Sequence, residues 1–308
     1  MTAFGVDIVG TKSLAVRWNG AEVETSSSVE NGTDRGTVDR IIDAVERVAD
    51  GTEEAIGVGV AGLVSPDDRT LAWGPHVPGT NLAIGDEIED RFGRPVVVDN
   101  DANVSLHAEL QIGAAVGYRH VLLVTLGTGI GGAIAADGAV YRGGGFAGEW
   151  GHMQVTQGGL LCDCGKRGCW ETLASGPALE RLAREVIDAN PNSSLARAIG
   201  PGPVTGPAVV EAADAGDETA RALVAEIGRA FGQGLADLAA IFDPELIVVG
   251  GGLGSVGEAI VGPARRTLID SLHGKAYRVA PTVQVAALGP ASGAIGAAML
   301  ADEEVARG

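Results

Sequence analysis

Two stretches of the chain repeat the same order of strand, glycine-rich turn and strand. In the first, an apolar segment at 3–9 leads through the turn DIVGTK into an alternating segment at 14–18. In the second, a strand at 120–126 leads through GTGIGG into a return strand at 133–136. Elsewhere such strands alternate with segments of helical periodicity, which is typical of layered α/β folds. The sequence therefore predicts an α/β protein with a weak internal duplication.

The length of the chain sets the number of domains. At 308 residues it is too long for one simple core and fits two domains. We place a smaller N-terminal domain at 1–118 and a larger C-terminal domain at 119–290. The terminal segment 291–308 is rich in Ala and Gly, so we expect it to form a helix that packs closely on the first domain. Residues 190–205, rich in Pro, Gly and Ser, are expected to be an exposed connector.

All three cysteines lie within eight residues of one another, shortly after a histidine, in the segment GEWGHMQVTQGGLLCDCGKRGCWE. The candidate ligands are His152, Cys162, Cys164 and Cys169. One imidazole and three thiolates fill a tetrahedral zinc shell and leave no position for water, which is typical of a structural site. The alternative is three buried cysteines near an unrelated histidine. A closed zinc site is not itself catalytic, so we expect it to hold the flanking Glu149 and Glu171 in place.

Three glycine-rich turns follow strands, at Val9–Thr11, Gly127–Gly132 and Gly250–Gly252. Glycine permits φ > 0 and lets backbone N–H groups approach phosphate oxygens, although any one such turn can simply close a hairpin. GTGIGG is followed by an alternating strand rather than a helix, and no ribose-binding acid follows it, so a Rossmann site is excluded. Three turns spread over both halves predict a nucleotide held between two domains.

The cluster Asp99-Asn100-Asp101-Ala102-Asn103 stands between a predicted strand and a predicted helix. Asp and Asn are preferred N-cap residues, so the cluster could serve only to start the helix. A carboxylate at the carboxyl end of a strand also lies where open α/β sheets bind ligands, and there it could accept the proton of an attacking hydroxyl. Both roles are compatible. Asp7 has a similar pair of interpretations, either holding Mg²⁺ through water or capping a turn.

The chain is strongly acidic, with a net charge of -18 and a pI of about 4.6. Such a field repels nucleic acid and anionic lipid, so we expect neither as a partner. The chain has 22 Lys and Arg residues, of which only Lys12, Lys166 and Lys275 are lysines. This composition resembles proteins of salt-accumulating cells, the alternative being an ordinary acidic enzyme from a high-GC genome.

The same composition bears on location. No apolar run approaches the length of a membrane span, and the start of the chain lacks the pattern of a signal peptide. Cysteines grouped as metal ligands indicate a reducing compartment. We therefore expect a cytoplasmic protein.

Taken together, the motifs resemble those of the ROK family of sugar kinases, within the actin-like, ribonuclease-H-like ATPase superfamily, nearly from end to end. DIVGTK resembles the first phosphate motif, LGTGIGG the second, LIVVGGG the adenosine-side motif and VVVDNDAN the catalytic motif. GEWGH with CDCGKRGCWE resembles the family's sugar and zinc signature and is highly specific, whereas the glycine turns are shared across the superfamily. The resemblance implies a two-domain, hexokinase-type fold with an interdomain cleft.

The resemblance also implies roles for individual residues. Asp101 would be the general base that takes the proton of a sugar hydroxyl, O6. The sugar ring would be bound by Asn81, Asn100, Asp101, Glu149, Glu171 and His152, the last while also ligating zinc. The phosphates and Mg²⁺ would be surrounded by Asp7, Gly10, Thr11, Lys12, Gly127, Thr128 and Gly129. The adenosine would lie near Gly250, Gly251 and Gly252.

Two positions depart from the family pattern. Val9 stands where the family usually has glycine, and because a β-branched residue does not easily take φ > 0, we expect a reshaped first phosphate turn. Thr80 stands where many members have an aromatic residue, next to the proposed sugar contact Asn81.

The activity implied by the resemblance is ATP- and Mg²⁺-dependent phosphorylation of glucose to glucose 6-phosphate by a zinc-containing homodimer or homotetramer. Fructose, mannose or N-acetylglucosamine as the substrate, polyphosphate as the donor, and a non-catalytic sugar sensor remain alternatives. ROK transcriptional repressors carry a helix-turn-helix segment ahead of the first phosphate motif. Only six residues precede Asp7 here, and the net charge opposes DNA binding, so a regulator is not expected.

Overall fold

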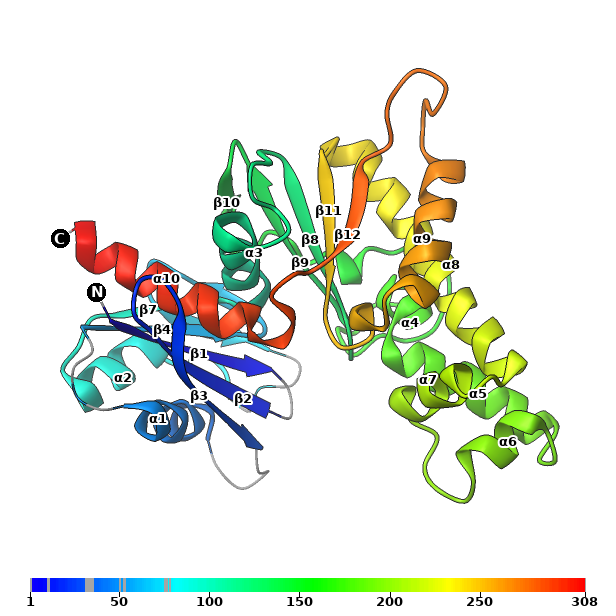
Figure 1. The fold of residues 1–308 in the computed structure, drawn as a ribbon, viewed down its shortest axis with the longest axis horizontal. Helices are drawn as coiled ribbons and strands as arrows, with labels where there is room; N and C mark the ends of the chain where they lie inside the picture. The colour runs from blue at the N-terminus through cyan, green and yellow to red at the C-terminus, as the bar shows by residue number, and fades with distance from the viewer. Residues whose placement is uncertain are drawn as a thin grey trace. The chain divides into compact units, whose positions relative to one another are not determined.

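A computed structural model describes residues 2–9, 12–30, 36–49, 51, 54–74, 77 and 79–307. The chain forms two units (Figure 1). The first is made of residues 1–119, 133–148 and 287–308, and the second of residues 120–132 and 149–286. Residues 133–148, which the sequence-based division assigned to the second domain, group with the first unit.

The first sheet has the strand order β3-β2-β1-β4-β7. Its strands are β1 (Ala3–Val9), β2 (Lys12–Trp18), β3 (Val23–Glu30), β4 (Ala55–Val60) and β7 (Val96–Asn100). β1 pairs antiparallel with β2 and parallel with β4, and β4 pairs parallel with β7. A separate two-stranded sheet is formed by β5 (Leu63–Ser65) and β6 (Thr70–Trp73). The parallel strands place the ends of β1, β4 and β7 at one edge of the sheet.

Helices cover both faces of this sheet because side chains alternate along its strands. On one face, Phe4 and Ile56 pack in a core with α1 (Thr37–Val48) and α2 (Ile84–Phe92). On the other, Ala3 and Ala55 pack with α3 (Asp101–Ile112) and α10 (Ser292–Arg307). A Cβ at Gly57 would lie 1.9 Å from the Ala297 carbonyl oxygen, so glycine lets α10 approach the strands closely.

The second sheet has the order β10-β9-β8-β11-β12. Its strands are β8 (Val121–Leu126), β9 (Ile130–Ala136), β10 (Ala139–Tyr141), β11 (Leu246–Gly250) and β12 (Thr282–Val285). β11 pairs parallel with β8 and with β12. If the strands of each five-stranded sheet are numbered by their order in the chain, both sheets have the spatial order third, second, first, fourth, fifth. The expected internal duplication is therefore confirmed at the level of strand order.

Apart from β8, β11, β12 and the start of β9, the second unit is mainly helical. Its helices are α4 (Glu171–Ala174), α5 (Gly176–Ala189), α6 (Ser194–Ile199), α7 (Gly206–Asp214), α8 (Glu218–Phe242) and α9 (Glu258–Ser271), with short 3₁₀ turns η1 (Trp150–His152) and η2 (Gly254–Val256). A third turn, η3 (Gly289–Ala291), leads into α10 in the first unit. None of the helices in the described part of the chain is long and apolar enough to cross a membrane.

Helix α6 lies in the segment that the sequence analysis expected to be an exposed connector. That expectation is wrong for 194–199, because the hydroxyl of Ser193 accepts a hydrogen bond from the Ala196 N–H at 3.1 Å and caps a short helix. Leu195 is fully buried and fixes this helix to the unit.

Candidate active site

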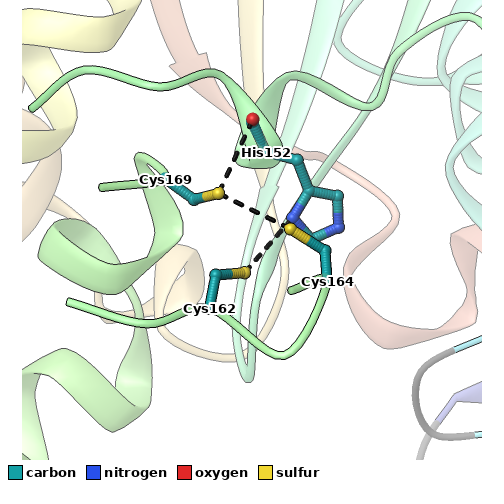
Figure 2. Close-up of side chains that lie close together, drawn as sticks. All are labelled: His152, Cys162, Cys164 and Cys169. Carbon is teal, nitrogen blue, oxygen red and sulfur yellow. Dashed lines mark hydrogen bonds between the residues drawn. The ribbon is translucent and has the colours of Figure 1, made fainter. Parts of the chain in front are cut away.

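His152, Cys162, Cys164 and Cys169 converge in the second unit, as Figure 2 shows. One candidate ligand atom from each lies within 4.8 Å of all the others. The Sγ atoms of Cys164 and Cys169 are 3.6 Å apart, and Cys162 Sγ is 3.6 Å from His152 Nδ1. A tetrahedral zinc site with Zn–S of about 2.3 Å and Zn–N of about 2.05 Å requires separations of roughly 3.6–3.8 Å. The donor types and their spacing therefore fit zinc.

The backbone around the cluster explains how so short a segment brings these side chains together. Gly165 and Gly168 have φ of 86° and 77°, values that side-chain-bearing residues rarely adopt. The turn is closed by a hydrogen bond from the Cys162 N–H to the Lys166 carbonyl at 2.8 Å. The Lys166 Nζ donates to the His152 carbonyl, also at 2.8 Å, and joins the cysteine loop to η1.

Two carboxylates flank the His152 ring on opposite sides. Glu171 Oε1 is 3.2 Å from Nδ1, and Glu149 Oε2 is 3.9 Å from Nε2. Glu171 Oε1 also accepts a hydrogen bond from the Cys162 thiol at 2.8 Å. The expected association of Glu149 and Glu171 with the cluster is thus present in the structure.

The two glutamates differ in their electrostatics. Burial raises the pKa of the Glu149 carboxyl. Burial also opposes ionisation of Glu171, but the hydrogen bonds with His152, Cys162 and the Ile130 backbone, together with the charge of His152, outweigh burial and leave the pKa of Glu171 lowered. The hydrogen bond with Glu171 raises the pKa of His152. Of the two carboxyls, Glu171 is therefore the more readily ionised.

The second glycine turn is packed directly against these residues. A Cβ at Gly129 would lie 2.7 Å from Glu171 Oε2, so only glycine leaves that carboxylate its place. The indole N–H of Trp150, next to Glu149, donates to the Gly131 carbonyl at 3.1 Å. A Cβ at Gly151 would lie 2.0 Å from the Ile130 carbonyl oxygen. The GTGIGG turn and the GEWGH segment therefore form one packed structure.

The third glycine turn lies beside the second. β8 and β11 are parallel neighbours, so their carboxyl ends meet at one edge of the sheet, where α/β folds bind ligands. Gly251 has φ of 82°, and a Cβ there would lie 2.5 Å from the Leu126 carbonyl oxygen. A Cβ at Gly127 would lie 3.9 Å from the backbone nitrogen of Gly252. The glycines predicted to contact phosphate and adenosine are thus brought together.

In the first unit, the residues of the DNDAN cluster have distinct roles. Asn100 is the N-cap of α3, and its side chain accepts hydrogen bonds from the N–H groups of Ala102 at 2.9 Å and Asn103 at 3.3 Å. Asp99 is buried and forms an ion pair with Arg142, with Oδ2 2.6 Å from Nη2. Asp101 is the first residue of α3 and is only partly buried. Of the two carboxylates, Asp101 is the one accessible for chemistry.

Asp7 lies in the interior of the first unit, with 5% of its surface exposed. Burial, and then the charge of Asp101, raise the pKa of its carboxyl. Its Oδ1 has no hydrogen-bond partner among the described residues, and an unsatisfied buried carboxylate oxygen fits a group that binds a hydrated cation. A Cβ at Gly293 would lie 2.2 Å from Oδ2, so the first turn of α10 needs a glycine where it packs against this carboxylate.

Only part of the first phosphate turn lies within the described residues. Gly10 and Thr11 lie outside the described residues, as does the side chain of Lys12. Val9 is the last residue of β1 and pairs with Lys12. Val9 therefore has the extended backbone that suits a β-branched residue, and the concern that it must adopt φ > 0 does not apply.

Asn81 and Thr128 complete the predicted set. Asn81 lies in the first unit, is exposed and has φ of 52°, and its N–H donates to the Ala72 carbonyl at 3.0 Å. Thr128 is exposed on the second glycine turn. The sequence analysis did not identify Arg142, because its partner Asp99 is 43 residues away and no local pattern marks the pair.

Comparisons with known proteins identify related sequences and structures. A model of the ROK family matches residues 3–304. The chain is 39% identical to a glucokinase of Streptomyces coelicolor over 307 residues, which covers 97% of each protein. The crystal structure of a ROK family glucokinase from Streptomyces griseus with glucose and AMPPNP superposes with a TM-score of 0.91 at 39% identity, covering 98% of this chain and 100% of that one. A ROK hexokinase from Thermus thermophilus matches at 34% identity with a TM-score of 0.78, covering 100% of both chains.

Proposed function

The chain belongs to the ROK family and has its actin-like ATPase fold, and on this basis we propose that it transfers the γ-phosphoryl group of ATP to the 6-hydroxyl of glucose. The observation that carries the proposal is the packing of the second glycine turn against Glu171 in the second unit. A turn suited to phosphate and a carboxylate suited to a sugar hydroxyl are held side by side, as phosphoryl transfer to a sugar requires.

Asp101 is the general base in this proposal. Its carboxylate accepts the proton of the 6-hydroxyl as that oxygen attacks phosphorus, a role worth about 10²- to 10⁴-fold in rate. Asp101 lies in the first turn of α3, near a helix N-terminus, where backbone N–H groups interact favourably with negative charge. The Ala102 N–H also donates to Asp101 Oδ1 at 3.0 Å.

The sugar ring hydroxyls are bound by Asn81, Asn100, Glu149, His152 and Glu171. In the second unit, His152 turns Nδ1 toward Cys162 and Glu171, which leaves Nε2, on the Glu149 side, for a hydroxyl. Zinc held by His152, Cys162, Cys164 and Cys169 would supply a rigid cross-link that fixes the imidazole ring of His152. Once a bound sugar shields them from water, polar groups of this kind discriminate strongly among hydroxyl patterns.

The nucleotide is held by backbone of the glycine turns, with Gly127, Thr128 and Gly129 at the phosphates and Gly250, Gly251 and Gly252 at the adenosine. Asp7 with Lys12, Gly10 and Thr11 completes the phosphate contacts. The unsatisfied Oδ1 of Asp7 is the group that would bind Mg²⁺ through water. Bound Mg²⁺ supplies neutralisation of the phosphate charge.

The remaining proposals concern the setting of the protein. We place it in the cytoplasm, as a homodimer or homotetramer, in a cell that accumulates salt. Support comes from the three free cysteines, which suit a reducing compartment, and from the net charge of -18, which salt would screen.

The test is ADP release from Mg-ATP at high KCl with glucose, fructose, mannose and N-acetylglucosamine. We expect sugar-dependent release that is strongest with glucose, and a loss of at least about 10²-fold in kcat for Asp101→Asn. Asp90→Asn, at an exposed position on α2, is the matched control and should keep wild-type turnover. Near-normal turnover by Asp101→Asn would remove the general-base assignment. Folded, zinc-loaded protein inactive with every sugar would refute the kinase.

A further inference from the structure

Arg142 and Asp99 form a partly buried ion pair next to the proposed general base. The guanidinium donates to Asp99 Oδ2 through Nε at 2.7 Å, and its Nη2 lies 2.6 Å from the same oxygen. The Asp99 side chain is 3% exposed and that of Arg142 is 32% exposed. Arg142 reaches Asp99 from the segment that follows β10, so the contact joins two distant parts of the first unit.

The other oxygen of Asp99 is tied to the helix that carries the base. Oδ1 accepts hydrogen bonds from the Asn100 N–H at 2.8 Å and from the Asn103 side-chain amide at 2.9 Å. Asn100 in turn caps α3, whose first residue is Asp101. One carboxylate therefore connects Arg142 to the backbone immediately before the base and to the first turn of its helix.

Arg142 is itself held by its main chain. Its carbonyl accepts hydrogen bonds from the N–H groups of Gly145 at 2.8 Å and Ala147 at 3.3 Å, which closes a tight turn. A planar guanidinium on a fixed backbone defines the position of the carboxylate that it binds, in a way that a flexible ammonium cannot.

We propose that Arg142 is a positioning residue for phosphoryl transfer, acting through Asp99 to set the placement of Asp101 and of the sugar-binding side chain of Asn100. The proposal rests on the proposed function, since it assigns Asp101 and Asn100 to that reaction. A displacement of about 1 Å at a reacting group costs on the order of 10²-fold in rate, so a loosened pair has a large kinetic effect. Ion pairs at exposed positions have no such leverage.

The experiment compares Arg142→Lys and Arg142→Met with Arg119→Met. Arg119 belongs to the same unit and pairs with Asp137 at 2.8 Å, but the two side chains are 68% and 74% exposed, so it serves as the matched control. Steady-state kinetics are measured well below each variant's melting temperature and expressed per folded molecule. Glucose affinity is measured separately by calorimetry.

We expect kcat to fall about 10-fold in Arg142→Lys, which keeps the charge but not the planar fork, and about 100-fold in Arg142→Met. Glucose affinity should weaken in both, and Arg119→Met should stay within about 2-fold of wild type. A merely structural pair would instead lower the melting temperature and leave kcat per folded molecule unchanged. That result, for Arg142→Lys in particular, would overturn the proposal.

A double-mutant cycle with Asp99→Asn tests whether the two residues act as a unit. Combined with Arg142→Met, the losses in kcat should be strongly non-additive, whereas additive losses would overturn the proposal. Wild type is assayed in parallel. An inactive wild type would refute the proposed reaction. The positioning role of Arg142 would then be tested by glucose affinity alone, and an unchanged affinity in Arg142→Met would refute that role.

Discussion

Gly129→Ala should impair sugar binding while leaving the fold nearly as stable as before. The added Cβ would lie 2.7 Å from Glu171 Oε2, and an ordinary contact begins at 3.4 Å, so the carboxylate must move by about 0.7 Å. The obstacle is the end of a flexible side chain rather than backbone. The move therefore disturbs the Glu171 contacts with His152 and Cys162 rather than the main chain.

The magnitude follows from what Glu171 loses. A displaced carboxylate forfeits a charge-assisted hydrogen bond to the sugar, worth about 1.5–3 kcal/mol, which corresponds to roughly 10- to 150-fold in glucose affinity. Gly129 does not have a positive φ, so alanine can adopt its backbone conformation. Replacing glycine by alanine lowers the conformational entropy of the unfolded chain, which stabilises the folded protein by about 0.4–1 kcal/mol. The net change in the free energy of unfolding should be within about 1 kcal/mol of zero.

Calorimetric titration with glucose in the absence of nucleotide isolates this effect from any change in phosphate binding. Gly202→Ala is the control, because it lies in the same unit, lacks a positive φ and has open space around its Cβ position. Wild-type glucose affinity in Gly129→Ala would refute the assignment of Glu171 as a sugar contact. A large loss of stability would instead show that the glycine turn cannot accept even one methyl group.

Two further predictions follow from the metal ligands and from a buried histidine. Loss of a residue that only supports a metal ligand weakens metal binding by about 10- to 100-fold, so Cys164→Ser, which removes a ligand itself, should weaken zinc binding by more than this and should lower the melting temperature. Metal analysis measures the first effect and thermal melting the second. Full zinc content in the variant would contradict the prediction. His107, on α3, has its Nε2 3.1 Å from Glu303 Oε1. Burial lowers the pKa of His107 from 6.5, and the charge of Arg142 lowers it further, whereas the carboxylates of Glu303 and Asp99 act to raise it. The folded state therefore binds fewer protons than the unfolded chain once the pH falls through about 6.5, so the free energy of unfolding decreases there. The urea midpoint should drop between about pH 7.5 and about pH 5.5, and this drop should be smaller in His107→Gln. An unchanged drop would show that His107 does not contribute to this pH dependence.

Local patterns predicted much of the site. The spacing of His152 and the three cysteines was sufficient to group them, because a short loop with glycines at its bends has few ways to arrange four ligands. Glycine turns after apolar strands likewise located the carboxyl ends of β8 and β11. Both features depend on residues close together in the chain, where hydrophobic periodicity and turn chemistry are informative.

Features that depend on distant residues could not be predicted. The sequence did not show that Asp99 would bind Arg142, nor that residues 133–148 would group with the first unit. Helix α6 was missed because its six residues offer one buried side chain, Leu195, and its cap is a serine in a segment rich in loop-forming residues. Helix α9, with Pro263 inside it, gave no clear helical pattern either.

The packing of α10 on β1 and β4 determines the order in which the protein can mature during synthesis. Its residues, 292–307, leave the ribosome after every residue of the second unit, which ends at 286. Until then the strand faces around Gly5 and Gly57 remain uncovered, and Asp7 lacks the backbone at Gly293 that encloses it. Because domains fold as units on the nascent chain, the second unit should be complete while the first still waits for its last helix. A nascent chain that has emerged from the ribosome only as far as residue 286 would therefore have its second and third glycine turns and its cysteine loop folded, but its first sheet still open on one face.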